Sequence, residues 1–178
     1  MRIAVVLMLL CIVMPLLSTG CSVPGCQAAP QGTQVRISQQ AAQRVQVKVE
    51  QIAASARPDF VFDVTDEEAT SYLALNFNQT SITEPEVRFL SGKVQLSGKV
   101  AQLLNNPVVT VWTAQVVDGT VRVKIVSASV ACIPLPTQLL DSLSDTLNQM
   151  ILESQVNIKV LDIKVDAGRA QVTGQKTR

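Results

Sequence analysis

The sequence contains no histidine, and this absence excludes several kinds of chemistry. Histidine is the commonest general acid and base, the usual partner of a nucleophilic serine or cysteine, and the commonest metal ligand. Sites of the Ser-His-Asp and Cys-His types and histidine-based zinc sites are therefore excluded. No carboxylate pair or serine-lysine dyad placed for catalysis is visible either. We expect no catalytic residue, no metal site and no cofactor, and hence no enzyme.

Aromatic residues are scarce, at 3% of a chain that is 47% hydrophobic. The core must therefore consist of aliphatic side chains. Sugar-binding surfaces rely on exposed aromatic rings, and Tyr72 and Trp112 are the only large amphipathic aromatics in the sequence. A carbohydrate-binding module is disfavoured.

Basic residues are neither abundant nor clustered. Of the 15 basic residues only Arg2 lies within residues 1–20, and none of the 14 acidic residues does, so the remainder balances at 14 against 14. Nucleic-acid-binding proteins gather Lys and Arg into patches or stripes. We therefore exclude nucleic acid as a partner.

The N-terminal segment is typical of a bacterial lipoprotein signal. Arg2 precedes an apolar run over Ile3–Leu17, and a Ser-Thr-Gly sequence leads directly into Cys21. A secretory signal needs about 7 to 15 apolar residues, whereas a membrane-spanning helix usually needs about 20. The resemblance to a lipobox implies that residues 1–20 are a signal peptide and that Cys21 is acylated, with palmitate or a similar chain. An uncleaved signal anchor is the alternative. In both cases the chain is exported and held on the extracytoplasmic face of a bacterial membrane.

The cysteines cannot form a four-cysteine metal site. Cys11 is removed with the signal and Cys21 carries the lipid, which leaves Cys26 and Cys132. Disulfides persist in exported proteins, but pairing requires Cα atoms within about 7 Å of each other. Two alternatives stay open: a disulfide between Cys26 and Cys132, or a buried Cys132 and an unpaired Cys26.

The remaining chain divides into a tether and one domain. Residues 21–35 contain several prolines and glycines and no hydrophobic periodicity, which predicts a flexible tether. Residues 36–178 are enough for a single domain that buries about two-thirds of its unfolded surface.

Three helices are predicted in this domain. The first begins after Ser38, an N-cap residue, and must end before Pro58. The second follows a short strand and begins at Thr65-Asp66-Glu67-Glu68, a capping box in which the acidic residues oppose the helix dipole. The third covers residues 137–155 and carries a wide apolar stripe, which we expect to pack against a sheet.

A glycine-turn repeat organises the β-structure. Ser91–Gly98 and Ala167–Gly174 match conservatively at every position, and Asp118–Val123 is a shorter version. Each follows a β-rich run, so the three units predict antiparallel hairpins with their turn glycines at positive φ. These glycines are Gly92, Gly119 and Gly168.

The alternation of apolar residues changes phase in two of the strands. The change falls after Ile125 in one and after Val160 in the other, and the stretch Val108–Val117 is apolar on both faces. A phase change requires a β-bulge, a sharp twist or burial on both faces. We therefore expect a long, strongly curved sheet.

The order of these elements resembles the bacterial envelope branch of the tubular lipid-binding (TULIP-like) superfamily. The resemblance rests on the capped helix at Val64-Thr65-Asp66-Glu67-Glu68-Ala69, the glycine-turn hairpins, and a Pro134-Leu135-Pro136 break before the last helix. It implies a curved antiparallel sheet wrapped round a helix, with an apolar groove for acyl chains. The motifs are architectural, so the resemblance transfers no lipid-contact residue.

These observations predict an α+β fold, with a long curved, mainly antiparallel sheet of hairpins packed on amphipathic helices. We expect a membrane-anchored envelope lipoprotein that binds or transfers a lipid or other apolar ligand in an apolar cleft. The alternative is a non-catalytic structural or protein-interaction module of the envelope. The expected cleft lies between the sheet and the helix of residues 137–155. Its candidate ligand contacts are Val109, Val111, Trp112, Leu139, Leu143 and Leu147.

Overall fold

The computed structural model describes residues 34–76, 82–100, 105–155 and 157–177, which form an α+β fold of two antiparallel sheets. The fold class is as predicted. The signal peptide, Cys21 and nearly all of the expected tether lie outside the described residues. The elements, in chain order, are α2 (Gln39–Ala54), β1 (Asp59–Thr65), α3 (Asp66–Asn76), β2 (Ile82–Leu90), β3 (Lys93–Val100), β4 (Asn106–Val117), β5 (Thr120–Val130), β6 (Ile133–Pro134), α4 (Thr137–Ser154), β7 (Ile158–Asp166) and β8 (Arg169–Lys176).

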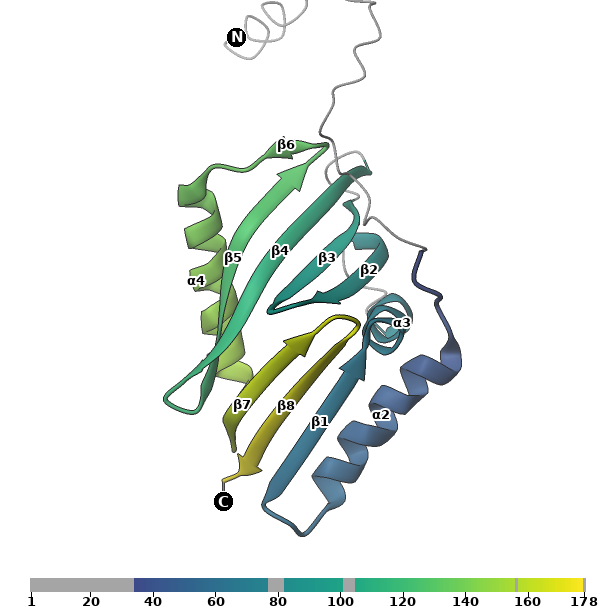
Figure 1. Ribbon diagram of the computed structural model, residues 1–178, viewed down its shortest axis with the longest axis vertical. Coiled ribbons are helices and arrows are strands. Elements are labelled where there is room, and N and C mark those ends of the chain that lie inside the picture. The colour runs from purple at the N-terminus through teal and green to yellow at the C-terminus, as the bar shows by residue number, and fades with distance from the viewer. Residues whose placement is uncertain (1–33, 77–81, 101–104, 156, 178) are drawn as a thin grey trace, which may run out of the picture.

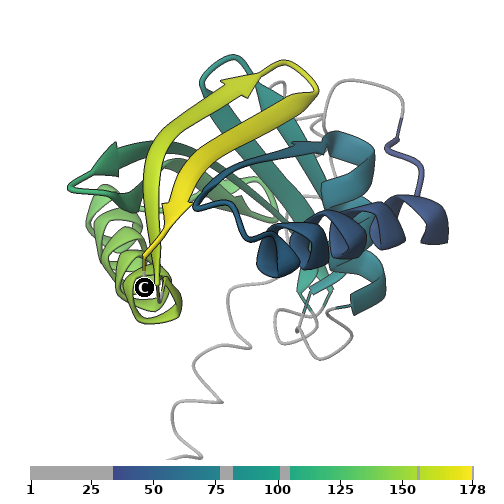
Figure 2. The ribbon, with the colours of Figure 1, turned by 90° about the horizontal axis from the view of Figure 1, so that it is seen from below.

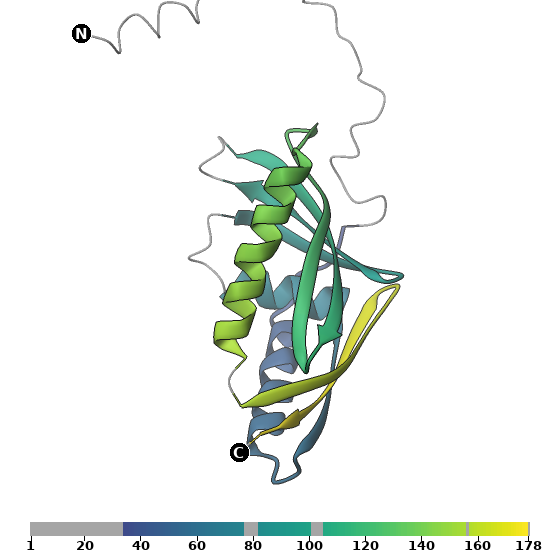
Figure 3. The same cartoon turned by 90° about the vertical axis from the view of Figure 1, so that its left-hand side faces the viewer.

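The two sheets lie side by side, and α2 and α4 lie on the same side of them (Figures 1 and 2). One sheet has the strand order β1-β8-β7 and the other has the order β2-β3-β4-β5-β6. Helix α4 runs alongside β5, as Figure 3 shows, whereas α2 packs on α3 and β1 near the opposite edge. Helices α2 and α4 therefore lie near opposite edges on the same side of the sheets.

Hairpin turns join the two sheets through backbone hydrogen bonds. Gly92 N–H donates to the carbonyl of Val165 (2.8 Å), and Gly168 N–H donates to the carbonyl of Phe89 (2.9 Å). All three predicted turn glycines have positive φ, at 70°, 79° and 81° in chain order, as a tight hairpin turn requires. Beneath these turns a core cluster joins β2, β3 and β8, built on Val87, Phe89, Val94 and Ala170.

Both predicted phase changes are β-bulges. The register between β4 and β5 skips Val126, and the register between β7 and β8 skips Leu161. Each bulge falls directly after the last residue of the earlier phase, Ile125 or Val160. A bulge bends a strand and increases its twist, so these two positions contribute to the curvature that the sequence predicts.

The helix starts also agree with the sequence. Ser38 caps α2 with its side chain, which accepts a hydrogen bond from Ala41 N–H. In the capping box, Glu68 N–H donates to Thr65 Oγ1 (3.3 Å) and Thr65 N–H donates to Glu68 Oε2 (3.2 Å). Helix α3 also buries polar residues, which the sequence did not predict: Thr70 and Ser71 are fully buried.

Only part of the predicted apolar stripe of α4 packs against a sheet: Leu140 is buried against Ile125 and Ala128 of β5. The residues of α4 that face β5 are Leu140, Ser144 and Asn148, and Ser144 Oγ accepts from Ile125 N–H (2.9 Å). Polar side chains thus hydrogen bond along the edge of β5, which β6 covers only near its end. Because these residues take the inner face of the helix, the other members of the stripe point elsewhere and are exposed, namely Leu139, Leu143, Leu147 and Met150.

The interpretation of Cys132 as a buried thiol is also wrong. Cys132 is exposed, in the tight connection between β5 and β6, and is disulfide-bonded. Its partner is outside the described residues, as is Cys26, so their pairing stays a prediction.

Candidate functional site

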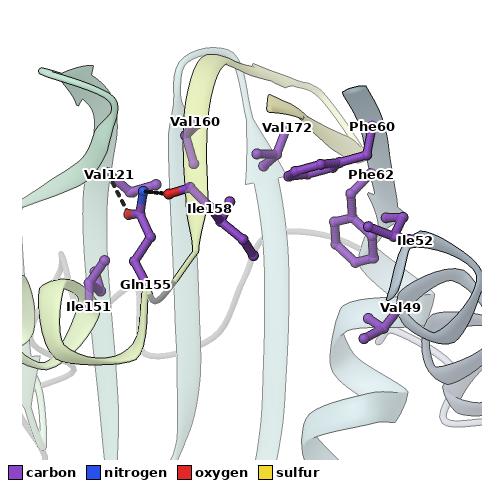
Figure 4. Close-up of a pocket in the computed structure, with 10 residues that line it drawn as sticks. All are labelled: Val49, Ile52, Phe60, Phe62, Val121, Ile151, Gln155, Ile158, Val160 and Val172. Atoms are coloured by element: carbon purple, nitrogen blue, oxygen red, sulfur yellow. Dashed lines mark hydrogen bonds between the residues drawn. The ribbon is translucent and has the colours of Figure 1, made fainter. Parts of the chain in front are cut away.

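An open apolar pocket of about 350 Å³ lies between α2, α4 and the β1-β8-β7 sheet (Figure 4). Side chains from five strands and helices converge on it, and the first residues of β5 close one side. All of the lining residues except Gln155 are apolar. They are Val49, Ile52, Phe60, Phe62, Val121, Ile151, Gln155, Ile158, Val160 and Val172.

Strand and helix periodicities place these side chains on one side. Phe60 and Phe62 in β1, and likewise Ile158 and Val160 in β7, are two residues apart and so share a sheet face. The bulge at Leu161 then shifts the phase of β7. The wall that β7 gives to the pocket is therefore confined to the beginning of the strand.

Gln155 is the polar residue of the lining, and its amide is committed to the protein backbone. Its Nε2 donates to the carbonyls of Gly119 (2.7 Å) and Ile158 (3.1 Å), and its Oε1 accepts from Val121 N–H (3.2 Å). Both amide hydrogens are thus used. Gln155 ties the end of α4 to β5 and β7, and its amide offers a ligand no hydrogen-bond donor.

The six ligand contacts predicted from the sequence do not belong to the pocket lining found in the described part of the chain. Three of them, Val109, Val111 and Trp112, are half-buried in β4, and Trp112 packs against both core clusters. The other three lie along α4 and are 38–44% exposed. They are Leu139, Leu143 and Leu147, and they precede the pocket residues of that helix.

Sequence reasoning missed the contributions of α2, β1 and β8. A signal was present, because Phe60 and Phe62 are two of only four phenylalanines in the chain and stand at alternate positions of one strand. What the sequence did not reveal is that this strand and the final hairpin form a separate sheet beside α2.

Glu68 is the centre of a cluster of charged side chains with Arg44 and Lys48, and this cluster has a structural role. Glu68 is 4% exposed, and its carboxylate accepts hydrogen bonds from Arg44 Nε and Lys48 Nζ, both at 2.9 Å. Burial raises the pKa of Glu68, but the hydrogen bonds from Lys48, Arg44 and the Thr65 backbone outweigh it, so the pKa is lowered overall. The cluster fastens α2 to the start of α3, since every oxygen of this carboxylate is engaged by the protein.

No protein-family model matches this chain, and no curated protein resembles it with significant sequence similarity. Within the described ranges, no three His, Cys, Asp or Glu side chains come together as a metal site would require. The helices described here include none with the length and apolar character needed to cross a membrane. The pocket is the candidate functional site.

Proposed function

We propose that this protein binds the hydrocarbon chain of a lipid in the pocket between α2, α4 and the β1-β8-β7 sheet. The observation that supports this most strongly is the lining, in which nine apolar side chains surround one glutamine that is already hydrogen bonded. Ligand sites are typically apolar clefts of about 300 to 1,000 Å³. A volume of about 350 Å³ accommodates about twelve methylenes, if each takes up about 30 Å³, the volume of a water molecule.

An open apolar pocket of this size is stabilised when an apolar group covers it, because apolar surface removed from water contributes roughly 25 cal/mol per Å². An acyl chain fits the lining because it needs no hydrogen-bond partner there. It also fits the predicted lipoprotein anchor at Cys21, which would hold the domain beside a source of such chains.

A substitution in β7 tests the proposal, with a matched control in the same strand. Ile158 lines the pocket and is 39% exposed, whereas Leu161, at the bulge, is 45% exposed and outside the lining. A carboxylate in the pocket would lose solvation when a chain enters, which is costly for an unpaired charge. Ile158→Asp should therefore abolish protection of a fluorescent acyl probe, and Leu161→Asp should leave it unchanged.

Circular dichroism must show that both variants are folded. If Ile158→Asp protects the probe as well as the parent does, the chain does not bind in this pocket.

The protein-interaction module is the second candidate, because three leucines of α4 are exposed. It predicts that a purified domain binds no lipid at all and that these leucines contact another protein.

A further inference from the structure

The exposed leucines of α4 form a ridge that leads into the pocket. Leu139, Leu143 and Leu147 follow one another at four-residue spacing, and the next members of the series, Ile151 and Gln155, line the pocket. Residues four apart in a helix are neighbours in a row inclined to the helix axis, because each step turns about 40° beyond a full turn. From Leu139 to Ile151 this row winds about a third of the way around α4. We call Leu139, Leu143 and Leu147 the leucine ridge.

The ridge extends the apolar wall well beyond the pocket. From Leu139 to Ile151 the helix rises about 18 Å, at about 1.5 Å per residue. The polar residues that bind β5, Ser144 and Asn148, occupy the neighbouring helix face and hold α4 in place without using the ridge. The ridge is therefore available as a surface while the fold stays intact.

We propose that the ligand is a long-chain lipid whose acyl chain exceeds the pocket and continues along the leucine ridge. This inference rests on the proposed function, and it adds the length and the direction of the chain. An acyl chain is the occupant because the two surfaces are continuous. The pocket takes about twelve methylenes at about 30 Å³ each, and the ridge begins at Leu147, one turn of α4 before the pocket residue Ile151.

The polar group of the lipid points away from the pocket. Among the described residues no charged side chain lines the pocket, and both amide hydrogens of Gln155 are used by the backbone. The lining therefore offers a head group neither a charge nor a hydrogen-bond donor, and the methyl end of the chain occupies the pocket.

A chain-length series separates the pocket from the ridge. Saturated fatty acids from about 8 to about 18 carbons compete with a fluorescent acyl probe, and each fully buried methylene raises affinity up to about fourfold. In the parent, affinity should continue to rise beyond about twelve carbons, by about twofold per methylene. The gain is smaller there because a chain lying on the ridge contacts the protein on one side only, which buries roughly half of each methylene.

The double variant Leu143→Ser/Leu147→Ser should bind the short chains as the parent does and gain nothing beyond about twelve carbons, which is the volume limit of the pocket. Leu152→Ser is the matched control, because Leu152 is 51% exposed on the same helix but lies off the ridge. It should keep the slope of the parent.

The outcomes distinguish the two proposals. If no chain of any length binds, the proposed function fails and the ridge proposal fails with it. If short chains bind but the parent shows no gain beyond about twelve carbons, the ridge proposal alone is overturned. It is also overturned if the double variant keeps the slope of the parent, or if the control loses it.

Discussion

Asn148 pairs with Val123 as a neighbouring strand would: its Oδ1 accepts from Val123 N–H (2.7 Å) and its Nδ2 donates to the Val123 carbonyl (2.9 Å). A helical side chain thus satisfies both backbone groups of a buried residue at the edge of β5. Unpaired strand edges favour aggregation, so this pair has a structural role. Because Asn148 turns this face of α4 toward β5, Leu139, Leu143 and Leu147 are left exposed.

The first prediction concerns this pair. Asn148→Ala should destabilise the domain by about 2 to 4 kcal/mol, because two backbone groups of Val123 lose their partners and each unsatisfied group costs about 1 to 3 kcal/mol. Urea denaturation measures the loss. Gln149→Ala, one residue further along the exposed side of α4, should change stability by less than about 0.5 kcal/mol. Equal effects of the two substitutions would contradict the edge-pairing role.

The second prediction concerns Glu68. Glu68→Gln removes the charge that Arg44 and Lys48 share, and each hydrogen bond to a charged group contributes about 1.5 to 3 kcal/mol. We expect a loss of about 2 to 4 kcal/mol at neutral pH, measured by denaturation. Glu67→Gln is the control, since Glu67 makes only a long, half-exposed contact with Arg44 and such pairs contribute about 0 to 1 kcal/mol.

The lowered pKa of Glu68 also predicts how the stability difference between the parent and Glu68→Gln depends on pH. A carboxyl with a depressed pKa in the folded state contributes its stability fully above the unfolded value, about 4.3 for Glu. That contribution is lost as the pH falls through the folded pKa. The stability difference between the parent and Glu68→Gln should therefore shrink in acid below about pH 4. A difference that stayed constant down to the acid limit would show that the charge of Glu68 is not what stabilises the contact.

The third prediction concerns the turn between β4 and β5. Gly119 has φ of 79°, and a Cβ there would lie 2.7 Å from Lys159 Cγ. Gly119→Val should cost on the order of 1 to 3 kcal/mol, the usual range for a strained backbone position. Gly168→Ala measures the cost of the positive φ alone, because Gly168 has a similar φ but a Cβ added there would meet no neighbouring atom. An unchanged melting midpoint for Gly119→Val would count against the hairpin.

The fourth prediction concerns the anchor. If Cys21 is acylated, two or more chains hold the protein to the membrane, since each buried methylene contributes about 0.8 kcal/mol. Cys21→Ser should appear in the soluble fraction or remain unprocessed in whole-cell fractionation. A variant that fractionates and migrates like the parent would refute the lipoprotein assignment.

The features that the sequence predicted well depend on local rules. The capping box at Thr65 and Glu68, the hairpin glycines and the bulge positions follow from neighbouring residues and from strand alternation. The inner face of α4 could not be predicted in this way, because a prediction from hydrophobic periodicity assumes that the apolar side of a helix is the buried side. Here the partner of the helix is an open strand edge, and Ser144, Asn148 and Gln155 match its hydrogen-bonding groups better than leucine does.

The pocket was not predictable for a different reason. Its walls come from α2, β1 and the final hairpin, and Phe60 and Val172 are more than a hundred residues apart in the chain. Only the pairing of β1 with β8 brings them together. The sequence predicted an apolar cleft beside α4, which contributes Ile151 to the pocket, but it placed the candidate ligand contacts along the leucine ridge and in β4.

The central claim, that the pocket holds a lipid chain, is tested most directly by native mass spectrometry of the domain purified without detergent and incubated with phospholipid or fatty acid. The account predicts a protein ion carrying one lipid, lost in Ile158→Asp and kept in Leu161→Asp. A spectrum with only the bare protein mass, at lipid concentrations that saturate a control lipid-binding protein, would contradict it and favour the protein-interaction module.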